Sequence, residues 1–385
     1  MGRDRGRTVV GGAAGAVAVL LLTAGCSSSG GDAGRAPAPP SSSAPPSSSA
    51  PPAASSSAAA SPGAPRIAGV LTEDLKSPWG LAELPGGDLL VSSRDERTVT
   101  RVDARTGRKT ALGVVPGVVP GGEGGLLGLA VRDGWVYAYL TSATDNRIVR
   151  MRYEGGPGDR LGAPEPVLAG IPKGVIHNGG RIAFGPDGML YAGTGETGRT
   201  GLAQDRGSLG GKVLRMTPEG RPAPGNPFPG SVVYSYGHRN VQGLAWDPAG
   251  RLWASEFGQN TWDELNLVEP GKNYGWPVVE GRAGRSGYTD PVAQWRTADA
   301  SPSGIAYARG AVWMAGLRGE RLWRIPLSGA ERSGEPEAFL TGEYGRLRTV
   351  LATGGGTRLW LVTSETDTRG TPGPGDDKIL RLEVG

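Results

Sequence analysis

Two histidines are the only imidazole side chains in this 385-residue chain. His177 stands in the segment His177-Asn178-Gly179-Gly180, and His238 stands beside Arg239. An imidazole can act as a general base near neutral pH, but a lone histidine is more often structural. We interpret His238 as structural and keep both readings open for His177.

Charged residues suggest two further kinds of site. Arg239, Arg318, Arg346 and Arg348 could each be solvated at the surface. Aimed at one cavity, however, they would repel each other unless an anion bound among them. Glu264, in Trp262-Asp263-Glu264-Leu265, could face solvent or join backbone carbonyls around a hard cation such as Ca²⁺. Spacing alone favours neither reading.

A sequence motif that recurs six times predicts the strands that position these residues. A small residue, an aliphatic residue and Ala are followed by a turn and an apolar strand, and the copies begin near residues 80, 128, 180, 243, 304 and 349. The spacing leaves room for four strands per copy. We predict an all-β fold, a six-bladed β-propeller with four-stranded antiparallel blades over residues 66–385. An open β-sandwich would not explain why six similar units recur.

The polar residues occupy two equivalent places in the repeat. Those before the first strand of a copy are Glu123, His177, Asn178, Arg239, Asn240, Gln242, Arg346 and Arg348. Those after the second strand are Arg94, Glu196, Glu256, Phe257, Gly258, Gln259, Arg318 and Glu365. In a propeller both places emerge on one face, so we expect a convergent polar pocket at one mouth of the central channel. This position favours the catalytic reading of His177.

The N-terminus is typical of an export signal. Arg3, Arg5 and Arg7 precede an apolar run that ends in small residues before Cys26, the single cysteine. We predict a lipoprotein signal peptide at residues 1–25, lipidation of Cys26, and a disordered Ser/Pro/Ala stalk over residues 26–65. A buried thiol after the signal is the alternative for Cys26. The expected location is extracytoplasmic, with the membrane contacted through the lipid anchor only.

Charge argues against a nucleic-acid partner. The formal net charge is +4, and it falls to +2 once residues 1–25, with three Arg and one Asp, are removed. No basic stripe stands out along the chain, whereas nucleic-acid binding normally requires one.

Several blocks resemble the glucose/sorbosone dehydrogenase family of soluble quinoprotein glucose dehydrogenases and aldose sugar dehydrogenases. The resemblance runs from about Val70 to the C-terminus and rests on residues 124–128, 177–181, 234–240, 263–267 and 273–277. It implies a six-bladed propeller that uses pyrroloquinoline quinone (PQQ) and Ca²⁺. The implied reaction oxidises the C1 hydroxyl of an aldose to a lactone, and the electron acceptor stays unidentified.

The resemblance also implies residue roles. His177 matches the base, Glu196 the acid that orients it, and Arg239 a residue that binds the quinone and stabilises charge on its oxygen. The implied cofactor-binding residues are Glu123, Arg239, Asn240, Arg318, Arg346 and Arg348. The implied calcium ligands are the carbonyls of Gly258 and Gln259 for the cofactor's ion, and Glu264 with the carbonyl of Tyr274 for a structural ion.

Some positions depart from the family pattern. Glu123 stands where the glucose dehydrogenases have Gln, Glu196 where they have Asp, Phe257 where they have a polar residue, and Arg318 where they have Lys. These changes leave a second hypothesis, a non-catalytic cell-surface propeller that binds a carbohydrate or a protein. A Ca²⁺-dependent lactone or ester hydrolase ranks last, because the channel axis is expected to be cationic.

Overall fold

The computed structural model describes residues 63–156 and 158–385. The predicted signal peptide, Cys26 and the stalk up to residue 62 lie outside these residues. Apart from two single-turn 3₁₀ helices, η1 (Thr200–Ala203) and η2 (Gly354–Gly356), the regular structure in the described residues is β-strand. No helix in this part of the chain is long and apolar enough to span a bilayer.

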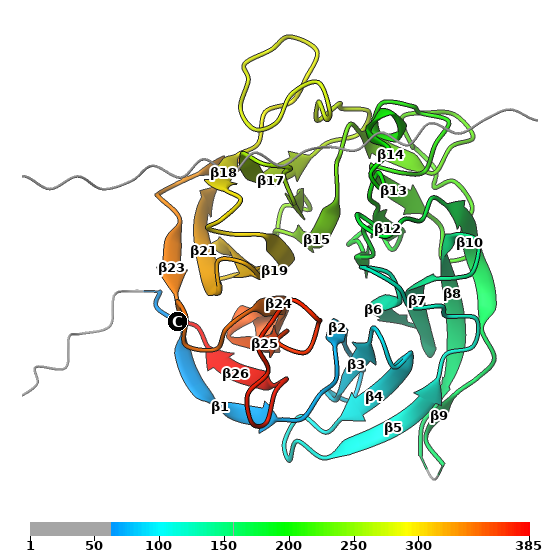
Figure 1. Cartoon of the computed structure of the whole chain (residues 1–385), viewed down its shortest axis with the longest axis vertical. Coiled ribbons are helices and arrows are strands. Elements are labelled where there is room, and N and C mark those ends of the chain that lie inside the picture. The colour runs from blue at the N-terminus through cyan, green and yellow to red at the C-terminus, as the bar shows by residue number, and fades with distance from the viewer. Residues whose placement is uncertain (1–62, 157) are drawn as a thin grey trace, which may run out of the picture. The chain divides into compact units, whose positions relative to one another are not determined.

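Six small antiparallel sheets form a ring around a central axis (Figure 1). The first three blades consist of β2 (Pro78–Glu83), β3 (Leu89–Ser93), β4 (Thr98–Val102), β5 (Lys109–Val114); β6 (Leu126–Arg132), β7 (Trp135–Thr141), β8 (Asn146–Glu154), β9 (Arg160–Leu161), β10 (Glu165–Ile171); and β11 (Ile182–Phe184), β12 (Leu190–Gly193), β13 (Lys212–Met216), β14 (Val233–Tyr236). The other three consist of β15 (Val241–Trp246), β16 (Leu252–Glu256), β17 (Trp262–Val268), β18 (Ala293–Arg296); β19 (Pro302–Ala308), β20 (Ala311–Gly316), β21 (Arg321–Ser328), β22 (Glu331–Arg332), β23 (Glu337–Phe339); and β24 (Leu347–Thr353), β25 (Arg358–Thr363), β26 (Ile379–Glu383), β1 (Arg66–Thr72). The predicted six-bladed propeller is confirmed.

The glycine that opens most copies of the repeat lets the inner strands approach each other closely. A Cβ atom on Gly128 would lie 2.3 Å from the carbonyl oxygen of Gly180 in the next blade. One on Gly243 would lie 2.5 Å from the carbonyl oxygen of Ser303. No side chain fits at such distances. The backbones of neighbouring inner strands therefore pack almost directly against one another around the axis.

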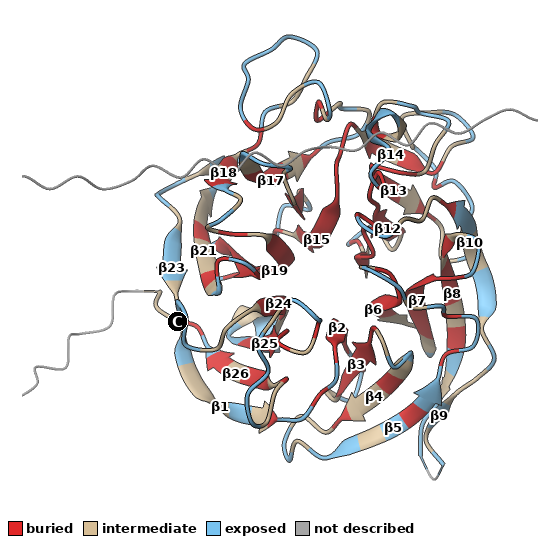
Figure 2. Cartoon of the chain, in the orientation of Figure 1, coloured by how far each residue is buried: buried red, intermediate tan, exposed pale blue. Residues whose placement is uncertain are grey.

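Burial decreases from the axis outwards (Figure 2). In the first blade β3 is buried at every residue, whereas the outer strand β5 has only Leu112 buried. The apolar cores lie between adjacent blades, as where Leu127 and Tyr139 of the second blade pack with Ile182 and Leu190 of the third. Each blade is thus held by both of its neighbours, which gives the loops at the channel mouth a rigid support.

The first described strand completes the last blade. β1 pairs antiparallel with β26, and Arg66 lies opposite Glu383 in the register. The sixth sheet therefore joins three strands from the C-terminal end of the chain to one strand from the beginning of the propeller. The repeat had predicted the six blades but not this closure.

Candidate active site

Three side chains from neighbouring loops meet at the channel mouth. His177 lies in the loop before β11, Glu196 follows β12, and Arg239 precedes β15. The Nδ1 atom of His177 is 2.5 Å from Oε1 of Glu196, and its Nε2 atom is 2.9 Å from the guanidinium NH2 of Arg239. All three residues are buried. The structure thus brings together the predicted base, its orienting acid and the predicted arginine.

These contacts determine which ring nitrogen of His177 carries the proton. A guanidinium N–H can only donate, so Nε2 must accept from Arg239 and be unprotonated. The proton of the neutral ring is then on Nδ1, where it is donated to Glu196. Nε2 has a single lone pair, so a substrate hydroxyl can bond there once it replaces the Arg239 N–H.

The backbone of His177 adopts a conformation that few non-glycine residues take. Its φ angle is +53°, in the left-handed region. The carbonyl of His177 accepts the N–H of Thr197 at 3.2 Å. A Cβ atom on Gly195 would lie only 1.9 Å from that carbonyl oxygen. A glycine at position 195 therefore lets the loop after β12 pass close enough to hold the base.

Arg239 is fixed by groups from the loop after β16. Its NH1 donates to the carbonyl of Phe257 at 3.1 Å, and its Nε donates to Oε1 of Gln259 at 3.1 Å. Its backbone N–H donates to the carboxylate of Glu256, which also bonds Nδ1 of His238 at 2.7 Å. Burial lowers the pKa of Arg239, although nearby carboxylates act in the opposite direction. His238 thus has the structural surroundings that the sequence predicted.

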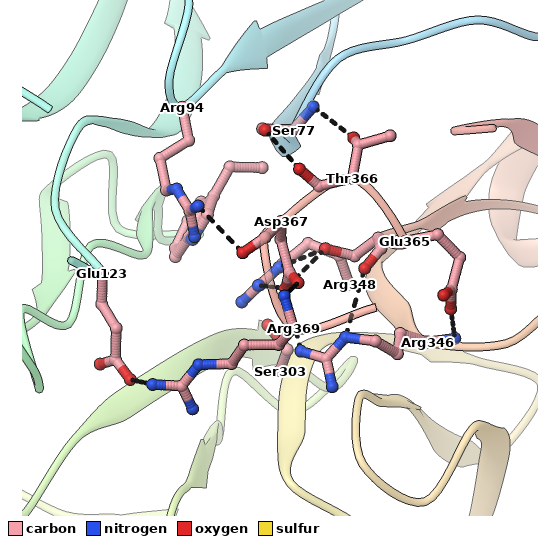
Figure 3. A network of polar contacts seen from close by, with 12 residues as sticks. Ser77, Arg94, Glu123, Ser303, Arg346, Arg348, Glu365, Thr366, Asp367 and Arg369 are labelled. Atoms are coloured by element: carbon pink, nitrogen blue, oxygen red, sulfur yellow. Dashed lines mark hydrogen bonds and ion pairs between the residues drawn. The ribbon is translucent and has the colours of Figure 1, made fainter. Parts of the chain in front are cut away.

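A second cluster of arginines is organised by one carboxylate (Figure 3). Oδ2 of Asp367 accepts NH2 of Arg346 at 2.9 Å and NH2 of Arg348 at 2.8 Å, while the Asp367 carbonyl accepts NH2 of Arg94 at 3.1 Å. Burial alone would raise the pKa of Asp367, but Arg348 and Arg346 outweigh it and hold the pKa at about 2. The anion expected among these arginines is therefore supplied in part by the protein itself.

Positive charge nevertheless remains in excess at the channel. Four arginines and two carboxylates line the axial cavity, namely Arg94, Arg346, Arg348, Arg369, Glu123 and Asp367, and a third carboxylate, Asp95, pairs with Arg94. Burial lowers the pKa of Arg348 to about 10 and, together with Arg348, that of the nearby Arg181 to about 9. Buried guanidinium groups with too little opposing charge fit an anionic ligand.

The other predicted cofactor residues are distributed over two cavities. Glu123 lines the axial cavity, while Arg318 is exposed and lines an adjoining cavity of about 680 Å³ that it shares with Arg346. Asn240 is buried and accepts the N–H of Gly179 through Oδ1 at 2.9 Å, and its Nδ2 atom has no partner within the described residues. An unpaired buried donor beside Arg239 is consistent with a ligand that offers acceptors.

Glu264, the one carboxylate among the residues predicted for calcium, lies close to a second buried carboxylate, that of Glu256. Burial, and then the charge of Glu256, raises the pKa of Glu264 to about 8. Oδ1 of the neighbouring Asn266 is buried and has no partner among the described residues. A bound cation could be coordinated by these oxygen atoms and would offset the negative charge of the two carboxylates. The surroundings of Glu264 therefore fit a hard cation.

The loop of the other predicted calcium ligands is folded around Glu280. Oε1 of Glu280 accepts the backbone N–H groups of Gln259 and of residues 260–262 at 2.8–3.2 Å. A Cβ on Gly258 would lie 1.9 Å from the carbonyl of Trp262. In the described part of the chain the carbonyls of Gly258, Gln259 and Tyr274 accept no hydrogen bond, so they are available as ligands. The described residues contain no group of three or more His, Cys, Asp or Glu side chains able to hold a metal.

Asp367 and Arg369 are site residues that the sequence did not single out. Both lie in the loop between β25 and β26, and both line the axial cavity. The cluster of arginines was the available signal, because buried cations require a carboxylate close by.

Comparisons with known proteins point to one family. A sequence model of glucose/sorbosone dehydrogenases matches residues 75–372. The fold is similar to that of the PQQ-bound form of aldose sugar dehydrogenase from Streptomyces coelicolor, with 70% identity, a TM-score of 0.82, and coverage of 84% of this chain and 98% of the other. Quinoprotein glucose dehydrogenase B of Acinetobacter calcoaceticus is 32% identical over 283 residues, which are 63% of this chain and 59% of that protein, less than two thirds of its length. An aldose sugar dehydrogenase of Escherichia coli is 30% identical over 266 residues, covering 64% and 71% of the two chains.

Proposed function

Because this chain belongs to the glucose/sorbosone dehydrogenase family, we propose that it is a PQQ- and calcium-dependent dehydrogenase that oxidises the C1 hydroxyl of aldoses to lactones. The observation that supports this most directly is the hydrogen-bonded series Glu196–His177–Arg239, in which Nε2 of His177 is held unprotonated. The family resemblance proposed from the sequence is confirmed by the match over residues 75–372.

His177 acts as the base. Its Nε2 atom takes the proton of the sugar's C1 hydroxyl as the C1 hydrogen leaves with its electron pair. Glu196 stabilises the imidazolium that forms, because its carboxylate accepts the Nδ1–H bond throughout. The side chain of Arg239 lies beside Nε2 and is placed to stabilise negative charge that develops on a nearby oxygen.

The remaining polar residues bind and orient. Bound PQQ would supply an ortho-quinone as the hydride acceptor and three carboxylates as anchors. Arg346 and Arg348 are the residues we assign to those carboxylates, because they keep surplus positive charge beside Asp367. The carbonyls of Gly258 and Gln259 would hold the cofactor's Ca²⁺, and Glu264 with the carbonyl of Tyr274 would hold a structural ion.

The decisive experiment titrates the purified full chain with PQQ and Ca²⁺ and then supplies aldoses with an artificial electron acceptor. The proposal predicts a quinone absorption change on loading and turnover that His177→Ala abolishes. Absence of both the spectral change and turnover would refute it, and would favour the non-catalytic carbohydrate- or protein-binding propeller instead.

We further propose that the enzyme works outside the cytoplasm on a lipid anchor at Cys26. The basic and apolar start followed by small residues and the single cysteine supports this. Cells that express Cys26→Ser should lose the protein from their membrane fraction. Equal membrane retention of the variant and the wild type would contradict the anchor.

A further inference from the structure

Glu123 is bonded at two points to the segment that carries the base. Its backbone N–H donates to the carbonyl of Val175 at 2.8 Å, and its Oε2 atom accepts the backbone N–H of His177 at 2.7 Å. The second bond is charge-assisted, which makes it stronger than an ordinary backbone bond. Glu123 therefore holds the main chain of His177 directly, rather than its ring.

Arg369 supplies the counter-charge from the opposite side of the channel mouth. Its NH2 donates to Oε1 of Glu123 at 2.8 Å, and its backbone N–H donates to Oδ1 of Asp367 at 3.0 Å. Figure 3 shows Arg369 reaching from the loop of the sixth blade to Glu123 on a loop far from it in sequence. Its side chain is 60% exposed, whereas that of Glu123 is 23% exposed.

The base needs such support for two reasons. A positive φ at a non-glycine residue is unfavourable and persists only when its surroundings hold it. In addition, the charge of Glu123 influences the pKa values of both Arg239 and Arg348, so it reaches the site where the base works. The ion pair that Glu123 itself makes among the described residues is with Arg369.

We propose that Glu123 and Arg369 form a positioning pair for the base: Glu123 fixes the backbone of His177, and Arg369 neutralises the charge that this bond introduces. Glu123 bonds the backbone of His177 and Arg369 bonds Glu123, so the role we assign to both acts through His177. The proposal rests on the proposed function for the role of His177 as base. An acid at position 123, where the resembling glucose dehydrogenases carry Gln, can pair with Arg369 as well as accept the His177 N–H.

The first test measures the pKa of His177 itself. The chain has only two histidines, so an untagged protein labelled at the histidine ring gives two imidazole signals, with His238 as an internal reference. We expect Arg369→Met to raise the pKa of His177 and Glu123→Gln to lower it, each by about half a unit, as is typical of partly exposed charges. The double variant should return close to the wild-type value.

This design isolates the pair from the other charged groups that face the base. The charged side chains bonded to the ring of His177 are Glu196 and Arg239, and every variant keeps both. The control is Arg160→Met, which breaks a more exposed ion pair with Glu154 on the β8–β9 hairpin. It should shift neither histidine.

The second test separates positioning from cofactor binding. Glu123→Ala removes the acceptor for the His177 N–H and should lower kcat about tenfold, the value of one charged hydrogen bond. The KM for the sugar and the affinity for PQQ should stay within about twofold of wild type, and Glu123→Gln should restore most of the rate because its amide oxygen still accepts.

Opposite pKa shifts in the two single variants, with a change in kcat alone, support the proposal. If the pKa of His177 shifts in the same direction in both single variants, or does not shift, the proposal is wrong. It is also wrong if Glu123→Ala loses as much PQQ affinity as kcat, because Glu123 would then be a cofactor ligand. If Glu123→Ala does not fold, the titrations still decide. If the wild type oxidises no aldose, the proposed function fails while the titrations still test the pair.

Discussion

Replacing Asp367 by Asn should destabilise the protein through the loss of one charge. The carboxylate of Asp367 bonds Arg346, Arg348 and Ser364, and its side chain is only 4% exposed. Its pKa is lowered from 3.8 to about 2. A shift of about two units corresponds to about 2–3 kcal/mol of folding free energy at neutral pH. Because Asn has a similar shape and still accepts hydrogen bonds, most of the loss in Asp367→Asn should be electrostatic.

The sign of the pH dependence provides the check. A carboxyl whose pKa is lowered in the native state stabilises the fold above the unfolded pKa, and this stabilisation disappears as the pH falls through the native pKa. The difference between wild type and variant should therefore be about 2–3 kcal/mol at pH 7 and about 1 kcal/mol at pH 3. Urea unfolding followed by tryptophan fluorescence measures both values.

An exposed aspartate is the matched control. Asp133 pairs with Arg132 at the surface, with 82% of its side chain exposed, and Asn adopts its left-handed conformation readily. Asp133→Asn should change the free energy of unfolding by less than about 0.5 kcal/mol at either pH. If the loss in Asp367→Asn is the same at pH 3 as at pH 7, it does not come from the charge and the reasoning is wrong.

Three more changes test the site. Glu196→Gln should lower kcat about 100-fold with little change in KM, because an amide cannot stabilise the imidazolium of His177; steady-state kinetics measures this. The metal-free protein should lose stability as the pH rises from 4.5 to about 8, because native Glu264 then keeps a proton that the unfolded chain has released; urea unfolding in a chelator or in Ca²⁺ should show Ca²⁺ reversing the loss. Gly195→Ala should lower both kcat and the melting temperature, because its Cβ would meet the His177 carbonyl at 1.9 Å, whereas Gly201→Ala, with open space around it, should do neither.

Each of these has a result that would contradict it. An unchanged kcat in Glu196→Gln would remove that residue from the proton path. A stability of the metal-free protein that is flat between pH 5 and 8 would show that Glu264 carries no excess proton. If Gly195→Ala and Gly201→Ala have the same kcat and melting temperature, the loop after β12 can move away from His177 without loss of activity or stability.

The inner strands of each blade could be predicted because the residues that determine them lie close together in the sequence. The small residue at the start of each copy marks where inner strands meet, and the close approach at Gly128 and Gly243 explains why it recurs. β1 could not be predicted in the same way. Its residues Arg66–Thr72 show no copy of the repeat, and its partner β26 lies at the other end of the chain.

The site was predictable where it follows the repeat. His177 and Glu196 flank adjacent strands of one blade, so the prediction that they emerge together needed only the hairpin of β11 and β12. The loop carrying Asp367 and Arg369 is different, because Asp377 fixes it through bonds to Thr366 and to the N–H of residue 365. No periodicity in the sequence reveals such bonds. For the same reason the repeat placed Arg318 on the correct face but could not show which cavity it lines.

The closure of the last blade by β1 has a consequence for the order in which the chain folds. Arg66 and Glu383, which are paired by an ion pair as well as by register, are 317 residues apart. During synthesis β1 is the first strand of the propeller to emerge and must wait for β26, so the sixth sheet cannot be completed until residues 379–383 have been made. Until then β1 and β25 each present an unpaired edge, which makes the newly made chain prone to aggregation in the interval before β26 is made. Deletion of β26 alone would leave the sixth sheet permanently incomplete, with the facing edges of β1 and β25 unpaired.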